Sequence, residues 1–135
     1  MTSRQVTVYG EPKAQPRPRA TARGGFARVY NPSTADEWKQ MIIDSARDNL
    51  GPWLGPVSLE IRFDMPRPKH LRGTNEKPHT VKPDIDNMVK AVMDALTSAL
   101  WWIDDDQVWE LKTSKQYAAK GEPSGVWIRA TEGEL

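Results

Sequence analysis

The clearest pattern in the chain is a strict alternation of apolar and polar residues over 57–65. Five apolar residues occupy every second position there, which is the spacing of a strand with one buried face. Shorter stretches over about 5–10, 108–113 and 126–131 also alternate or are rich in β-branched and aromatic residues, and each has glycine or aspartate near one end. The pattern therefore predicts four strands.

Two other stretches repeat apolar residues at helical spacing. One runs from about residue 34 to 50, where a capping box of Thr34 and Glu37 would begin the helix and a glycine–proline pair would end it. The second begins at about Asp86 and keeps its apolar residues on one stripe. The order β-α-β-α-β-β predicts a mixed α/β (α+β) single domain over residues 1–135, in which two helices pack on a mixed sheet.

Two segments rich in proline and basic residues, about 11–32 and 66–83, separate these elements. Proline and glycine interrupt regular structure, so both are predicted to be irregular loops. Loops of this length in a compact domain are usually functional or mobile. Trp127 fits a core position. Trp101 and Trp102 cannot both face inward on one regular element, so an interface position for one of them stands beside the simpler expectation of core packing.

Composition narrows the class of protein without identifying it. The 135 residues carry 19 Lys and Arg against 18 Asp and Glu, a net charge of +1, and 38% are hydrophobic, which suits a small globular domain. Cysteine is absent, which excludes disulfide scaffolds, thiol nucleophiles and cysteine-ligated zinc. No apolar run approaches the roughly 20 residues of a membrane span, and the N-terminus lacks the apolar core of a signal peptide. We therefore expect a soluble, cytoplasmic protein.

The small net charge conceals blocks of opposite sign. Residues 1–35 hold six basic groups and one acid, and residues 61–83 hold six and two. Residues 84–110 carry Lys90 alone against seven acids. Such asymmetry is informative about partners. Two basic segments beside a dense acidic one are what an enzyme needs if it grips a polyanion and holds metal ions.

The acidic block begins with Lys82-Pro-Asp-Ile-Asp-Asn-Met-Val-Lys90, at the junction of a loop and a helix. Pro83 disfavours a helical conformation before it, so Asp84 is expected at the start of the helix, where Asp84 or Asp86 can act as N-cap. In an extended stretch, residues two apart share a side. Asp84 and Asp86 can therefore point together while Ile85 turns into the core.

A third carboxylate from the Asp104–Asp106 triplet would complete a site suited to Mg²⁺, which prefers hard oxygen ligands. Such an ion activates a water for in-line attack on a phosphodiester. Lys90, about one helical turn further on, would stabilise charge on the phosphate or orient the water. From spacing alone a simpler alternative stays open. In that alternative the first pair is a helix cap with a solvated neighbour, the triplet is a polar turn, Asp94 is a structural hydrogen-bonding group, and His70 and His79 are solvated loop residues.

The quoted residues also resemble a known family, the RusA-type Holliday junction resolvases. Lys82-Pro-Asp-Ile-Asp-Asn-Met-Val-Lys-Ala-Val-Met-Asp-Ala-Leu-Thr97 resembles the family pattern Pro-Asp-x-Asp-Asn-x-x-Lys-x-x-x-Asp-Ala-Leu. Trp102-Ile-Asp-Asp-Asp-Gln-Val108 resembles the pattern Asp-Asp-x-Gln-Val. Gly10-Glu-Pro-Lys-Ala-Gln-Pro-Arg-Pro-Arg19 resembles the Lys-x-Arg-Pro-Arg arm of phage and prophage members. The resemblance spans about residues 6–118.

This resemblance implies a RusA-like fold and an endodeoxyribonuclease that depends on Mg²⁺, with Mn²⁺ as a substitute. Family members resolve four-way DNA junctions by paired nicks in recombination and repair, and they act as homodimers. Gln15 stands where many relatives carry lysine or glycine, and the extra Asp106 leaves the choice within the triplet open by one position. The implied site residues are Asp84, Asp86 and Asp105 as catalytic metal ligands, Lys90 as the catalytic lysine, and Asp104 or Asp106 as alternative ligands.

Basic side chains of the two loops are expected to neutralise phosphates, which makes DNA binding sensitive to salt. Junction recognition would then rest largely on shape. Two alternatives stay open: a less selective nuclease for flaps or other branched DNA, and a non-catalytic junction-binding accessory protein. The residues expected to bind DNA are Lys13, Arg17, Arg19, Arg23, Arg28, Arg67, Lys69, Arg72 and Lys82.

Overall fold

A four-stranded mixed sheet forms one layer of the domain. The computed structural model describes residues 2–15, 19–23, 26–30 and 35–133. The strands are β1 (Thr2–Tyr9), β4 (Val57–Met65), β5 (Val108–Tyr117) and β6 (Gly125–Glu132), in the spatial order β1-β6-β4-β5. β4 and β5 are parallel, whereas β6 runs antiparallel to both β1 and β4. The predicted mixed sheet is confirmed.

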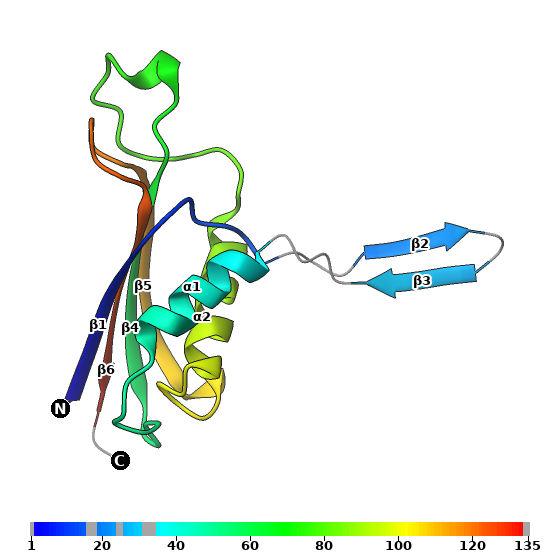
Figure 1. The fold of residues 1–135 in the computed structure, drawn as a ribbon, viewed down its shortest axis with the longest axis vertical. Coiled ribbons are helices and arrows are strands. Elements are labelled where there is room, and N and C mark those ends of the chain that lie inside the picture. Colours follow the sequence, from blue (N-terminus) through cyan, green and yellow to red (C-terminus); the bar gives the residue numbers. More distant parts are fainter. Residues whose placement is uncertain (1, 16–18, 24–25, 31–34, 134–135) are drawn as a thin grey trace.

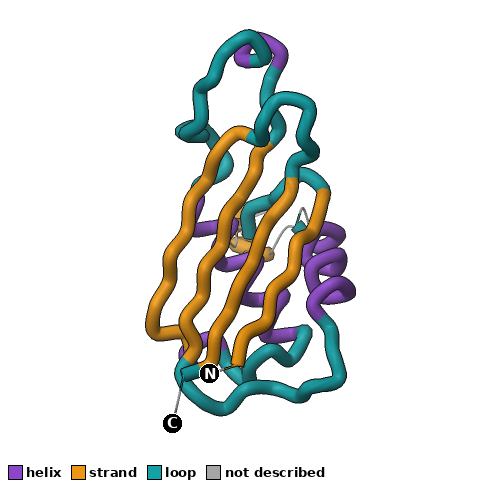
Figure 2. Tube along the Cα trace, turned by 90° about the vertical axis from the view of Figure 1, so that its left-hand side faces the viewer, coloured by secondary structure: helices purple, strands orange, loops and turns teal. Residues whose placement is uncertain are grey.

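Two helices form the second layer. α1 (Asp36–Ala46) and α2 (Ile85–Ser98) lie on the same side of the strands in Figure 1. Figure 2 looks onto the other face of the sheet, with the helices behind the strands. The alternation in β4 joins the two layers, because its five apolar side chains are all buried. The mixed α/β domain with two helices is confirmed, and no helix in the described ranges is long and apolar enough to cross a membrane.

The first helix is shorter than its sequence pattern indicates. It ends at Ala46 rather than near Leu50. The next residue, Arg47, is already extended, with ψ of 133°. The Asp48 carboxylate then accepts a hydrogen bond from the Leu50 N–H at 2.9 Å, which closes a turn. The predicted capping residue Thr34 lies outside the described residues.

The prediction of an irregular loop over 11–32 is wrong in its central part. β2 (Arg19–Arg23) and β3 (Phe26–Tyr30) pair antiparallel there as a hairpin. Figure 1 shows this hairpin projecting from the domain on the side of the helices. The sequence of β3 is rich in aromatic and β-branched residues, and Gly24-Gly25 is a hairpin signal. The many prolines around these strands masked that signal.

Both tryptophans that follow α2 are in the core. Trp101 is 2% exposed and Trp102 is fully buried. Two neighbours can both face inward because the chain turns irregularly before them, with a left-handed φ of 61° at Leu100. The indole N–H of Trp101 donates to the Ala46 carbonyl oxygen at 2.7 Å, and that of Trp102 donates to the Thr97 hydroxyl at 2.7 Å. Core packing is therefore confirmed, and the interface alternative is wrong.

Trp127 lies on the other face of the sheet. It is half-buried there, with the Arg62 guanidinium 5.6 Å from its ring centroid. Its neighbours Val126 and Ile128 are buried instead. The predicted core position of Trp127 is wrong because side chains alternate across a sheet, so that three consecutive residues cannot share a face.

A buried guanidinium joins three parts of the domain. Arg4 in β1 is 5% exposed, and it donates to the Asp48 carboxylate at 3.0 and 3.2 Å, the Gly51 carbonyl at 2.6 Å and the Trp101 carbonyl at 2.8 Å. It also lies 4.5 Å from the ring centroid of Trp53. A buried charge is tolerated only when its donors are paired. Arg4 therefore ties β1 to the turns that follow α1 and α2.

We expect Asp48→Asn to lower the free energy of unfolding by about 2–4 kcal/mol at neutral pH, because the substitution leaves a buried cation without its anion. Burial raises the pKa of Asp48, but hydrogen bonds from Leu50 and Arg4 outweigh burial and hold this pKa below its ordinary value. Such a carboxylate stabilises the fold above its unfolded-state pKa, and the contribution is lost as pH falls through the folded-state pKa. Thermal unfolding measured across acidic pH should therefore show a smaller acid-dependent loss for Asp48→Asn than for the wild type.

Asp44→Asn is the matched control, because Asp44 is an exposed carboxylate on α1 whose partner is Gln40. This variant should unfold within about 0.5 kcal/mol of the wild type at every pH. An Asp48→Asn protein with the same stability as Asp44→Asn would contradict the structural role of the Arg4–Asp48 pair.

Candidate active site

The exposed face of α2 carries a stripe of alternating charge. Asp86, Lys90 and Asp94 are four residues apart, so they follow one another along one side of the helix. The opposite side is buried and is formed by Met88, Val89, Ala91, Val92, Ala95 and Leu96. The amphipathic helix therefore presents the stripe on a rigid element that is anchored in the core.

Lys90 is held by carboxylates on both sides. Its Nζ donates to Asp94 Oδ1 at 3.0 Å and lies 3.6 Å from Asp105 Oδ2. Asp94 Oδ2 in turn lies 3.8 Å from Nζ of Lys39 on α1. The hydrogen bond to Asp94, helped by the charges of Asp94 and Asp105, raises the pKa of Lys90 against the opposing effect of burial. Lys90 is therefore suited to binding a negatively charged group. Asp94 accepts the hydrogen bond from Lys90, which confirms its predicted role as a structural hydrogen-bonding group.

The aspartate triplet forms the beginning of the 3-10 helix η2 (Asp105–Gln107). The Asp104 carboxylate accepts a hydrogen bond from the Asp106 N–H at 3.2 Å, and the Gln107 side-chain oxygen accepts from the Asp104 N–H at 3.0 Å. The bond from Asp106 is the main cause of a lowered pKa at Asp104. Asp104 thus caps this turn, whereas Asp105 contacts Lys90. Asp105 is the member of the triplet that faces α2.

The loop before α2 is fixed by a residue that sequence analysis missed. Asp84 is extended, with φ of −71° and ψ of 139°, and its carboxylate lies 3.4 Å from Nζ of Lys82. Nζ of Lys115 on β5 donates to the carbonyl oxygens of Val81 and Pro83, each at 2.6 Å. Burial lowers the pKa of Lys115, while the charge of Asp84 opposes that shift. Lys115 therefore positions the backbone that presents Asp84.

The signal for Lys115 was present in the strand pattern. Alternation places it on the same face of β5 as the buried Tyr117, where a lysine needs polar partners.

The predicted solvated state of His79 is wrong, because this side chain is buried against β5. His79 is 8% exposed, its ring centroid lies 4.9 Å from that of Tyr117, and burial followed by the charge of Lys115 lowers its pKa. His70 is exposed, as predicted.

Two shallow hollows flank the stripe, one at each half of α2. The first, of about 390 Å³, is lined by Glu11, Pro12, Lys13, Ala14, Lys82, Pro83, Asp84 and Asn87. The second, of about 400 Å³, is lined by Lys39, Asp94, Thr97, Ser98, Ile103, Asp104 and Asp105. Each hollow combines carboxylates with lysines, so the acidic residues of the site are bordered by groups that attract phosphate.

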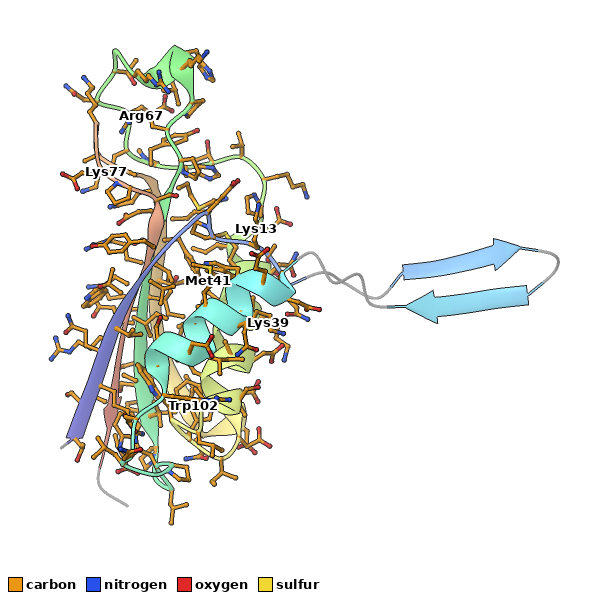
Figure 3. All side chains as sticks on the ribbon, in the orientation of Figure 1. Lys13, Lys39, Met41, Arg67, Lys77 and Trp102 are labelled. Atoms are coloured by element: carbon orange, nitrogen blue, oxygen red, sulfur yellow. The ribbon has the colours of Figure 1, made fainter. Side chains whose placement is uncertain are left out.

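The N-terminal arm is attached to both helices beside this stripe. The Gln15 N–H donates to the Asn87 carbonyl oxygen at 2.8 Å, and the Gln15 side-chain oxygen accepts from Nζ of Lys39 at 3.0 Å. In Figure 3, Lys13 and Lys39 lie on the side of the domain from which the β2–β3 hairpin projects. The hairpin therefore begins next to the candidate site.

The three predicted metal-binding carboxylates are not gathered into one group. Asp84 and Asp86 lie at the beginning of α2, whereas Asp105 contacts Lys90 further along the helix. Among the residues that the structure describes, no three Asp, Glu, His or Cys side chains are arranged to hold a metal ion. The pair of Asp84 and Asp86 still matches the chemistry of Mg²⁺, which takes one or two carboxylates and keeps several waters.

Arg67 orders the second basic loop from within. Its guanidinium donates to four backbone carbonyl oxygens, among them Glu76 at 2.8 Å and Ala118 at 3.1 Å. The loop over 66–83 is otherwise irregular, as predicted, apart from the 3-10 helix η1 (Lys69–Leu71). Figure 3 shows Arg67 within this part of the structure. With its donors engaged in the chain, Arg67 is unsuited to the predicted contact with DNA.

The other predicted DNA-binding residues differ in what the structure describes of them. Those that are exposed are Lys13, Lys69, Arg72 and Lys82. Arg17 lies outside the described residues. For three further arginines on the hairpin strands only the backbone is described: Arg19, Arg23 and Arg28. The four exposed residues are here called the basic border; Lys13 and Lys82 line the same hollow as Asp84, whereas Lys69 and Arg72 lie at η1 in the second basic loop.

We expect Lys115→Gln to loosen the loop that carries Asp84, because two charged hydrogen bonds to its backbone are lost. Hydrogen–deuterium exchange should be about tenfold faster over residues 80–84, which is the effect of roughly 1.4 kcal/mol in local opening. Lys120→Gln, a change at an exposed lysine between β5 and β6, is the control and should leave this exchange unchanged. Equal exchange in both variants would rule out the positioning role of Lys115.

Similarity to known proteins places this arrangement in a family. The family described as endodeoxyribonuclease RusA matches residues 9–129. The uncharacterized protein YqaN of Bacillus subtilis strain 168 is 37% identical over 125 residues, which cover 84% of this chain and 87% of that protein. The crossover junction endodeoxyribonucleases RusA of Escherichia coli K12 and Shigella sonnei are each 36% identical over 75 residues, which cover 56% of this chain and 61% of those proteins. The chain therefore belongs to the RusA endodeoxyribonuclease family and is a nuclease.

Proposed function

We propose that this nuclease resolves four-way DNA junctions by paired phosphodiester hydrolysis in recombination and repair, with Mg²⁺ as cofactor and Mn²⁺ as a substitute. The stripe on α2 carries the proposal, because it sets Asp86, Lys90 and Asp94 on one rigid face, with Asp84 at its beginning and Asp105 opposite Lys90. Relatives from Escherichia coli and Shigella sonnei are named crossover junction endodeoxyribonucleases, which supports this class of substrate.

Asp84 and Asp86 are the residues that would hold the metal ion. Bound there, Mg²⁺ supplies an activated water and stabilises the leaving oxygen of the phosphodiester. Without a cation, the two carboxylates repel the phosphate backbone, and the ion pair of Asp84 with Lys82 offsets that repulsion only in part. Lys115 contributes by holding the loop, so that Asp84 keeps its place at the start of α2.

Lys90 is the residue that would hold the charge of the phosphate. Its raised pKa keeps the ammonium group protonated, so it can attract a phosphate oxygen as negative charge develops there. Asp94 and Asp105 limit the positions that the ammonium group can take. Asp105 is retained as the third carboxylate of the site, and in this geometry it orients Lys90.

Paired cleavage calls for two sites on opposite strands. Each chain carries one stripe, so the active form would be a homodimer on a four-way junction. The basic border of Lys13, Lys69, Arg72 and Lys82 would contact phosphates on the arms of the junction. These contacts position the protein without reading base sequence, which suits recognition by shape.

The wild-type protein with Mg²⁺ should nick a synthetic four-way junction symmetrically and leave linear duplex largely intact, and a chelator should stop cleavage. Asp84→Asn and Asp86→Asn should each lower the nicking rate by about a hundredfold or more while junction binding persists, because a neutral amide is a poor ligand for the metal. Nicking rates and gel-shift binding measure the two effects separately. Equal rates on junctions, flaps and forked DNA would refute junction selectivity.

Within the triplet we expect a clear difference between neighbours. Asp105→Asn should lower the nicking rate roughly tenfold to a hundredfold, because it removes one of the two carboxylates at Lys90. Asp106→Asn is the matched control one residue away, since its carboxylate is exposed and Asp104 and Gln107 maintain the turn. Single-turnover nicking measures both, and equal loss in the two variants would contradict the assignment of Asp105.

The basic border should account for part of the salt dependence of junction binding. Replacing Lys13, Lys82 or Arg72 by Gln should each reduce the slope of log affinity against log salt by about 0.9. Arg47→Gln, at the end of α1 remote from the N-terminal arm, is the control and should keep the wild-type slope. Binding isotherms at several salt concentrations give the slopes. If the slope of log affinity against log salt is unchanged in one of these variants, the replaced residue does not contact a phosphate.

A further inference from the structure

The outer edge of β5 is covered along its second half. β5 is an edge strand of the sheet. The Lys115 carbonyl oxygen accepts a hydrogen bond from the His79 N–H at 3.1 Å, and the Tyr117 N–H donates to the Lys77 carbonyl oxygen at 2.8 Å. The loop before α2 thus pairs with this half of the strand, and it protects the backbone groups there.

The first half of the same edge lacks such cover. Backbone groups alternate in direction along a strand, so Leu111 and Thr113 direct theirs to the same outer side as Lys115 and Tyr117. In the part of the chain that the structure describes, no backbone group from outside the sheet bonds to Leu111 or Thr113. An open edge of this kind is a template for another strand.

This half of the edge is apolar as well as open. Trp109 is 68% exposed and Leu111 is 44% exposed, and Ile103, just before the strand, is 55% exposed. Edge strands that remain unpaired are usually protected by lysine or proline. β5 does carry Lys112, but Glu110 lies two residues earlier on the same face and balances its charge.

The charges flanking Leu111 are self-complementary. When two copies of β5 run antiparallel about a two-fold axis at Leu111, Glu110 of each copy lies opposite Lys112 of the other. An axis at Lys112 would place the two copies of Lys112 opposite each other, and an axis at Glu110 would place the two copies of Glu110 opposite each other. Both registers bring like charges together and are therefore disfavoured. Among the described residues Lys112 has no ion pair within the chain, so its charge is available to a partner.

The backbone fits the same register. The outward N–H and carbonyl groups of Leu111 would bond to those of Leu111 in the second copy, which is a hydrogen-bonded pair of an antiparallel ladder. An axis perpendicular to the sheet keeps the helix layers of both copies on one side. The two sheets would then join into one continuous sheet with Leu111 against Leu111 on the helix side.

We propose that β5 is the homodimer interface of this protein, paired antiparallel with β5 of a second copy in a register centred on Leu111. The inference rests on the proposed function to the extent that paired cleavage calls for a dimer. The partner strand is expected to be a second copy of β5, because the order Glu110-Leu111-Lys112 is complementary to itself in an antiparallel pair. An unrelated strand would match these charges only by chance.

The test is charge reversal on the full-length chain, with dimer dissociation constants from sedimentation velocity. Glu110→Lys alone and Lys112→Glu alone should each weaken the dimer roughly tenfold to a hundredfold, because both symmetry-related pairs become repulsive together. The double variant carrying Glu110→Lys and Lys112→Glu restores both pairs, and its dissociation constant should return to within about threefold of the wild type. Leu111→Arg should give a monomer, since two like charges then meet on the axis.

Glu122→Lys is the matched control, because it reverses an exposed charge in the connection between β5 and β6 and should leave the dimer unchanged. Glu110 accepts a hydrogen bond from Ser58 at 3.1 Å, so thermal unfolding of each variant checks that the fold is intact. A double variant as weak as the single variants would overturn the register. A wild-type protein that stays monomeric at micromolar concentration, or a dimer indifferent to every change, would overturn the interface.

Junction nicking on the same preparations keeps the two proposals apart. A wild-type dimer that dissociates as described on charge reversal, yet never nicks a junction, supports the interface and refutes the function. Symmetric nicking by a protein whose dimer ignores these substitutions supports the function and refutes the interface.

Discussion

The arrangement of this domain depends on the burial of one guanidinium. Arg4 is nearly inaccessible, and its donors are satisfied by Asp48, Gly51 and the carbonyl of Trp101, with the Trp53 ring against it. Because a charge in the interior must keep all of its partners, the ends of both helices are fixed relative to β1. The chain that follows α2 is therefore fixed at Trp101 and enters η2 in one direction, which brings Asp105 to Lys90.

Electrostatics organises the surface of the site as pairs of opposite charge. Lys82 lies beside Asp84, Lys90 lies between Asp94 and Asp105, and Lys39 supports Asp94 from the other helix. The near-zero net charge of the chain thus reflects compensation at short range as well as between segments. In the function proposed above, carboxylates that already have lysines beside them would exchange these partners for a metal ion and a phosphate without a large change in local charge.

The features that sequence alone predicted are those that follow from a local period. The alternation in β4, the apolar stripe of α2 and the position of Lys90 about one helical turn after Asp86 depend only on residues close in the chain. The same holds for Asp104 as a turn residue. Each of these predictions needed the geometry of a single helix, strand or turn.

The features that sequence did not predict depend on partners far along the chain. Lys115 fixes a loop more than thirty residues earlier, and Arg67 uses its charge on backbone carbonyls of its own loop and of Ala118. A basic residue counts equally toward net charge whether it faces solvent or a carbonyl oxygen. The hairpin was hidden for another reason, since flanking prolines outweighed the strand signal of five-residue segments.

The pairing of β1 with β6 has a consequence for how the domain forms. Thr2 lies opposite Glu132, so this ladder joins the most distant parts of the described chain. The unit that carries Asp84, Lys90 and Asp105 is instead one continuous stretch from α2 to β5. Contacts close in sequence cost less loop-closure entropy than distant ones. Local collapse of this stretch onto β4 is thus favoured early in folding, and we expect β1 with its buried arginine to dock last and fix the two helices in place.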